Sequence, residues 1–95
     1  MLPLQAEPRE GVVMAPVRSN TTIGCRVIGE QGEKTRIMWS REGERFRDGS
    51  YSMEGDTITL DMVGVKDAGY YYCSATQEQG ETKTASIQVH VSHQD

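Results

Sequence analysis

The chain has 95 residues, of which 36% are hydrophobic and 25% are charged, and its formal net charge is −4. This length suits one domain spanning residues 1–95, and the composition suits a small folded globule rather than a disordered segment. The acidic balance argues against nucleic-acid binding, and no apolar run approaches the roughly 20 residues of a membrane helix, so we expect no membrane insertion.

The charge is distributed unevenly along the chain. Residues 26–47 carry a net charge of +2, whereas residues 48–95 carry −6. The first four residues, MLPL, are too short and lack the basic start of a signal peptide. We therefore expect a dipolar surface, and any secretion signal would lie outside this sequence.

Alternating apolar and polar residues predict short β-strands along the chain. The segments with this alternation are residues 21–27, 35–39, 57–60, 69–75 and 85–91. Turn sequences rich in glycine and acidic residues separate them. Short strands joined by such turns predict an antiparallel sandwich or barrel.

The inward faces of these strands carry the two cysteines and the tryptophan. Cys25 and Cys73 stand 48 positions apart, and Trp39 lies on the strand that follows Cys25. Before Cys73 the chain contains the pattern D-x-G-x-Y-x-C, which starts at Asp67 and places Tyr71 two residues before the cysteine. A tyrosine at that position can anchor the chain to backbone upstream.

This constellation resembles the immunoglobulin superfamily, in its I-set or C2-like form, over about residues 12–91. The resemblance implies an all-β, immunoglobulin-like two-sheet antiparallel Greek-key sandwich with a Cys25–Cys73 disulfide packed beside Trp39. The family's fold motif corresponds here to Trp39, Leu60, Asp67, Gly69 and Tyr71. A disulfide closing this loop would stabilise the fold by about 4 kcal/mol.

Two positions depart from the family pattern. Arg18 stands in the turn before residues 21–27, where the family often has glycine. Ser50 stands where the family often has an arginine that begins strand D and pairs with the aspartate of the D-x-G motif. The candidate partners of Asp67 are therefore Arg45, Arg47 and Lys66.

The sequence gives little support to an enzyme, so we expect no catalytic residues and no cofactor. It contains no G-x-S-x-G, no G-x-x-x-x-G-K and no H-E-x-x-H. A catalytic role for either cysteine lacks a histidine partner in any motif. Zinc binding is equally disfavoured, because Cys25, Cys73, His90 and His93 are not at zinc-finger spacing.

The alternation of inward and outward side chains along the strands predicts a partner-binding face. In this family the segments at residues 35–39, 69–75 and 85–91 correspond to strands C, F and G of one sheet. Residues that alternate with the expected core of these strands must face outward, and several are of types enriched at protein interfaces. This candidate face comprises Arg36, Met38, Phe46, Tyr70 and Tyr72, with Phe46 placed in strand C′. The competing explanation is that cross-strand aromatic pairs only stabilise an exposed sheet.

Other surface features have weaker functional meaning. A basic stretch could contact a sulfated glycan weakly, but interleaved glutamates favour an ordinary solvated surface. The stretch comprises Lys34, Arg36, Arg41, Arg45 and Arg47. The polar loops at residues 29–34 and 76–81 share one end of the expected sandwich and could also contact a ligand.

Asn20-Thr21-Thr22 is an N-glycosylation sequon, usable if the chain enters the secretory pathway. The resemblance implies non-catalytic recognition of a protein partner by a module of an extracellular or cell-surface protein, such as an adhesion protein, a receptor ectodomain or a matrix proteoglycan. The partner could be another copy of the chain or a different protein. The alternative is a structural module of an intracellular muscle or cytoskeletal protein, whose cysteines often remain reduced.

Overall fold

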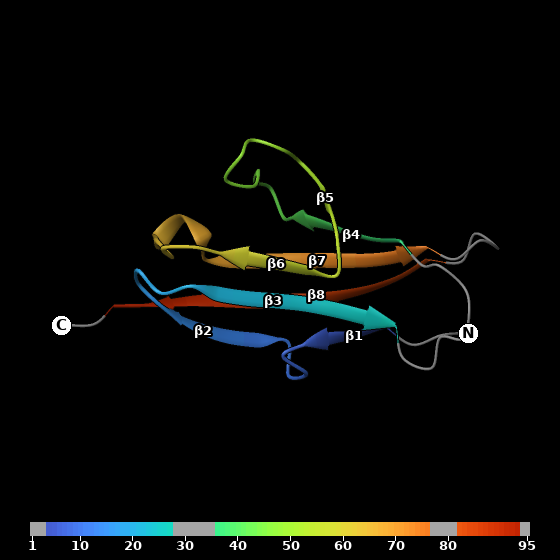
Figure 1. Ribbon diagram of the computed structural model, residues 1–95, viewed down its shortest axis with the longest axis horizontal. Helices are drawn as coiled ribbons and strands as arrows, with labels where there is room; N and C mark the ends of the chain where they lie inside the picture. Colours follow the sequence, from blue (N-terminus) through green and yellow to red (C-terminus); the bar gives the residue numbers. More distant parts are fainter. Residues whose placement is uncertain (1–3, 28–35, 77–81, 94–95) are drawn as a thin grey trace.

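The computed structural model describes residues 4–27, 36–76 and 82–93, which form two packed β-sheets (Figure 1). The first sheet has the strand order β1 (Leu4–Glu7), β3 (Thr21–Val27), β6 (Thr57–Leu60). The second has the order β2 (Val12–Pro16), β8 (Thr82–Ser92), β7 (Gly69–Thr76), β4 (Arg36–Arg41), β5 (Met53–Glu54). A short 3₁₀ turn, η1 (Val65–Asp67), precedes β7. The sandwich expected from the sequence is confirmed.

The N-terminal segment contributes to both sheets. β1 pairs antiparallel with β3, and β2 pairs in parallel with β8, where Val12 stands opposite Gln88. All other strand pairs are antiparallel, including β7 with both β4 and β8. The alternation in the sequence predicts neither β1 nor β2 as a strand.

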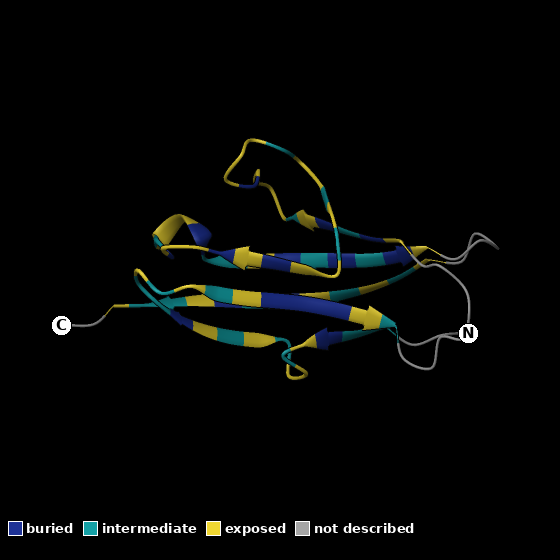
Figure 2. Cartoon of the chain, in the orientation of Figure 1, coloured by how far each residue is buried: buried dark blue, intermediate teal, exposed yellow. Residues whose placement is uncertain are grey.

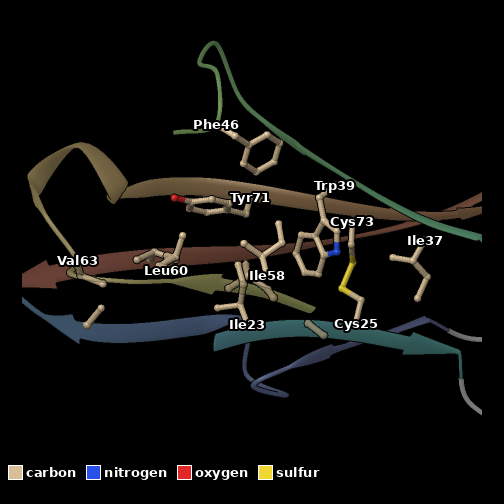
Figure 3. Packing of buried hydrophobic residues seen from close by; sticks show 14 of the residues in the cluster. Ile23, Cys25, Ile37, Trp39, Phe46, Ile58, Leu60, Val63, Tyr71 and Cys73 are labelled. Atoms are coloured by element: carbon tan, nitrogen blue, oxygen red, sulfur yellow. A yellow bond between two sulfur atoms is a disulfide. The ribbon is translucent and has the colours of Figure 1, made fainter. Parts of the chain in front are cut away.

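The core lies between the two sheets, and its residues follow the predicted alternation (Figure 2). Ile23, Trp39 and Tyr71 are almost completely buried, and Figure 3 shows them converging from opposite layers. Burial of one large apolar side chain contributes roughly 1.5–3 kcal/mol. The strands therefore hold together because each presents one apolar face to the same interior.

The segment between β4 and β6 differs from the prediction. Phe46, which we placed outward in a strand C′, is only 7% exposed, belongs to the core and lies in a turn. Ser50 does not begin a strand D; its backbone N–H and hydroxyl both donate to Asp48. The chain instead forms the two-residue β5 beside β4 and then enters β6 directly. Among the described strands, β3 is the only one that pairs with β6.

The turn before β3 explains one departure from the family pattern. Arg18 has φ 70°, the left-handed region that glycine adopts without steric penalty. Its N–H donates to the Val63 carbonyl at 2.7 Å, and Val63 N–H donates to the Ser19 carbonyl at 2.9 Å. These two hydrogen bonds keep a non-glycine residue in a conformation that costs about 1–2 kcal/mol.

Candidate interaction face

The disulfide and the tryptophan lie at the centre of the core, beneath the second sheet. Cys25 and Cys73 are bonded, with their Cα atoms 6.6 Å apart, which confirms the pairing implied by the resemblance. Trp39 lies beside them in Figure 3 and is buried. Its indole Nε1 donates to the Gly55 carbonyl at 2.8 Å, at the point where the chain leaves β5 for β6.

Asp67 is anchored by Arg47, one of the three candidate partners. Arg47 Nε donates to Oδ1 at 2.9 Å and Arg47 Nη2 donates to Oδ2 at 2.6 Å. The Gly64 N–H also donates to Oδ2, at 2.8 Å. The hydrogen bonds from Arg47 lower the pKa of the Asp67 carboxyl against the opposing effect of burial, and the Gly64 N–H lowers it further. Asp67 is therefore buried and charged in the η1 turn, with three donors directed at it.

Tyr71 and Arg41 complete this corner. The Tyr71 hydroxyl donates to the Asp67 carbonyl at 2.7 Å, which is the backbone anchor expected from the motif. The Arg41 guanidinium lies 4.6 Å from the centre of the Tyr71 ring. Arg41 Nη2 donates to the Ala68 carbonyl at 2.8 Å and pairs with Glu44 at 2.7 Å, while Nε is buried without an acceptor. Gly69 follows with φ 133°. These residues fix the chain where it enters β7.

The outer side of the second sheet carries two stacked tyrosines. The rings of Tyr70 and Tyr72 are 6.4 Å apart with an interplanar angle of 15°. Tyr70 is 45% exposed and Tyr72 is half-buried. The Tyr72 hydroxyl donates to Glu42 at 3.0 Å, and this hydrogen bond raises the pKa of Tyr72. Aromatic surface is therefore present on this side, as parity predicted.

Met38 and Arg36 lie on the same side, along β4. Met38 is half-buried between Ser74 of β7 and Glu54 of β5, and Arg36 is exposed and pairs with Glu54 at 3.4 Å. Of the five residues assigned to the face, four lie on this side, and Phe46 does not because it packs in the core. Arg36 belongs to the rim of the surface rather than to its apolar part.

The edge strand β2 extends this surface with residues that the sequence analysis did not assign. Val12 is 44% exposed and Met14 is 63% exposed. The register places Val12 beside Gln88 and Met14 beside His90, and Gln88 pairs in turn with Tyr70. The apolar run Val12, Val13, Met14 was the available signal, but nothing in it specified pairing with β8. We use "outer face" for Val12, Met14, Met38, Tyr70 and Tyr72.

The basic stretch does not form one patch. Arg36 faces outward on β4, whereas the buried Arg41 side chain pairs with exposed Glu44, and Arg47 is paired with Asp67. Arg45 lies over the ring of exposed Tyr51 at 4.6 Å. Lys34 and the polar loop at 29–34 fall outside the described residues, as do residues 77–81 of the polar loop at 76–81.

Asn20 is exposed at the turn between β2 and β3. Its Oδ1 accepts a hydrogen bond from the Met62 N–H at 3.0 Å, which leaves the side-chain nitrogen directed away from that contact. Within residues 4–27, 36–76 and 82–93, no group of His, Cys, Asp or Glu side chains could hold a metal ion. The same residues include no helix long and apolar enough to cross a membrane.

Solved structures with this fold include chains that contain several Ig domains. The N-terminal four Ig domains of Dscam1 isoform 4.44 match with a TM-score of 0.71 and 18% identity, over 96% of this chain and 21% of theirs. The complex of Dpr2 Ig1–Ig2 with DIP-Theta Ig1–Ig3 matches with a TM-score of 0.75 and 22% identity, over 95% of this chain and 32% of the matched chain. DIP-gamma IG1+IG2 matches with a TM-score of 0.76 and 19% identity, over 97% and 49%.

These identities show a shared fold, and the chain spans about a fifth of the Dscam1 structure. A search of curated protein sequences gave no match. The family model for the immunoglobulin domain matches residues 12–86, which include both cysteines, Trp39 and the D-x-G-x-Y-x-C motif. The chain therefore belongs to the immunoglobulin domain family.

Proposed function

We propose that the chain is a non-catalytic recognition module of an extracellular or cell-surface protein and binds a protein partner through the outer face. The stacked pair of Tyr70 and Tyr72 carries this proposal, because it adds aromatic surface to the side of the sheet that also carries exposed Val12 and Met14, with β8 between the two strands. Tyrosine and methionine are enriched at protein interfaces, and exposed apolar patches on small domains mark such sites.

The disulfide supports an extracellular location over an intracellular one. Such bonds persist in oxidising compartments and are rare in the cytosol. The structural neighbours include Dpr11 IG1 bound to DIP-gamma IG+IG2, a complex between Ig-domain proteins, which favours a protein as the partner of this face. An intracellular muscle module remains the second candidate, and native material with reduced cysteines would favour it.

Variants of the outer face test the binding proposal. Met38→Glu replaces an apolar side chain of the outer face with a charge, and Tyr72→Ala removes half of the stacked pair, so each should weaken partner binding by about 1 kcal/mol or more. Self-association is measured by sedimentation equilibrium, and binding to a panel of Ig-domain ectodomains by surface plasmon resonance. Thermal unfolding of each variant shows whether the domain remains folded.

Thr57→Glu is the matched control for Met38→Glu. Thr57 is exposed on β6 in the opposite sheet, so the same charge is added without touching the outer face. If the tyrosines only stabilise the sheet, Tyr72→Ala lowers the unfolding temperature while the folded fraction binds as the parent does. Unchanged affinity in both face variants would reject the outer face as the binding site.

Asn20 gives a separate prediction, which concerns whether the secretory pathway can glycosylate this chain. Expression in a secreting eukaryotic cell should add one N-linked glycan, because Asn20 is exposed and followed by Thr22 at the sequon position. Mass spectrometry before and after treatment with peptide N-glycosidase measures the occupancy. Asn20→Gln and Thr22→Val should both abolish the mass increase. A secreted parent chain with unmodified Asn20 would contradict this prediction.

A further inference from the structure

A cleft of about 960 Å³ is lined by the end of β4, by the segment that follows it and by the η1 turn, and none of its lining residues belongs to the outer face. Figure 1 shows where these segments run. Its lining includes four cationic side chains and two carboxylates. These are Arg41, Arg45, Arg47, Lys66, Glu44 and Asp67. The lining therefore carries a net charge of +2, in a protein whose net charge is −4.

The positive charge that remains available belongs to Arg45 and Lys66. Arg41 is neutralised by Glu44, and Arg47 is neutralised by Asp67. Arg45 and Lys66 are both exposed, and neither forms an ion pair with a described residue. Because the internal pairs already account for both carboxylates, a ligand that meets these two cations has no lining acid to displace.

The edge of the cleft is apolar and rigidly placed. Met62 is 63% exposed and Val65 is 66% exposed. Met62 has φ 50°, which is uncommon for a non-glycine residue. Its N–H donates to Asn20 Oδ1 at 3.0 Å and its carbonyl accepts from Arg47 Nη2 at 3.2 Å. A strained backbone fixed from both sides, with its apolar side chain in solvent, favours a contact role for Met62.

We propose that this cleft binds an acidic peptide segment of a partner protein. An apolar side chain of the peptide packs on Met62 and Val65, while flanking carboxylates meet Arg45 and Lys66. The combination of two available cations with an apolar edge favours a peptide over a sulfated polysaccharide, whose binding depends on many simultaneous ionic contacts. The cleft shares no residue with the outer face, so peptide binding in the cleft is tested independently of partner binding at the outer face.

The test is a ¹⁵N–¹H NMR titration of the disulfide-bonded chain with the capped peptide acetyl-Glu-Asp-Leu-Leu-Asp-Glu-amide. The matched control peptide carries Gln and Asn in place of the acids. We expect the acidic peptide to shift the amides of Met62, Val65 and Lys66, with weaker shifts at high salt. The control peptide should bind at least about tenfold more weakly, equivalent to 1.4 kcal/mol.

Protein variants assign the contacts. Arg45→Glu combined with Lys66→Glu should weaken peptide binding about tenfold or more, and Met62→Ser should weaken it several-fold. The matched control is Arg9→Glu combined with Arg26→Glu, which changes the net charge equally but alters exposed residues outside the cleft lining. This control should bind the peptide nearly as the parent does, and unfolding curves for all variants verify that they are folded.

Several results would overturn the proposal. No amide shift at about 1 mM peptide, where a site with a Kd of 1 mM is half occupied, would remove the site. Equal binding of the acidic and control peptides would show that peptide charge does not contribute to binding. Equal weakening by both double variants would show that the peptide does not bind in the cleft. If a heparin hexasaccharide shifts the cleft amides and the peptide does not, the site takes sulfated glycan and the assigned ligand class is wrong.

Discussion

Replacing Cys25 and Cys73 together with alanine is expected to lower the free energy of unfolding by about 4 kcal/mol. The disulfide closes a loop with a sequence separation of 48, and the chain-entropy account gives this magnitude for a loop of that length. Both cysteines are buried beside Trp39, so the loss of packed sulfur adds to the effect. Urea denaturation followed by far-ultraviolet circular dichroism measures the change.

The parent protein under reducing conditions is the matched control for this variant. It should lose a similar free energy, whereas the double variant should be insensitive to reductant. A loss below about 1 kcal/mol in both cases would mean that the sandwich does not depend on the covalent link for its stability.

Asp67→Ala is expected to destabilise the fold by about 2–3 kcal/mol at neutral pH. The carboxylate accepts charge-assisted hydrogen bonds from Arg47 and one from Gly64, and such bonds contribute about 1.5–3 kcal/mol. The control is Asp61→Ala, which removes an exposed carboxylate that precedes Asp67 in the chain. It should change the free energy of unfolding by less than about 0.5 kcal/mol. Equal stability of the Asp67 variant and the parent would show that the ion pair contributes nothing.

The same carboxyl group predicts a pH dependence. The pKa of the Asp67 carboxyl is lower in the folded protein than in the unfolded chain, where it is about 4. The carboxylate therefore stabilises the fold fully above about pH 4, and this stabilisation is lost as pH falls through the folded pKa. The stability of the parent should therefore fall more steeply than that of Asp67→Ala below about pH 4, and the two curves should converge. Parallel curves over this range would contradict the assignment.

The sequence predicted the strands that carry both the alternation and the cysteines. β3 and β6 occur at the predicted bounds, because each alternates strictly and contributes to the core on one face. β1 and β2 were missed because their pairing depends on partners distant in sequence, β3 and β8. Local alternation contains no information about those partners.

Phe46 shows why parity alone is insufficient. It stands between Arg45 and Arg47, which made an outward-facing strand consistent with the pattern. In the structure this segment turns back over the sandwich, so Phe46 packs against Tyr71 with ring centroids 6.2 Å apart. Arg47 could not be distinguished from Arg45 as the partner of Asp67 for the same reason. The direction of the turn around Phe46 decides which guanidinium reaches the Asp67 carboxylate.

The parallel pairing of β2 with β8 has a mechanical consequence. The two strands run in the same direction, with Val12 opposite Gln88 and Pro16 opposite Ser92. Tension applied through β1 and through the C-terminal end of β8 would pull them past each other along their length (Figure 1). Their inter-strand hydrogen bonds would then be loaded in shear and share the force, instead of opening one after another as in a peeled hairpin. This geometry suits a domain whose two ends are stretched apart.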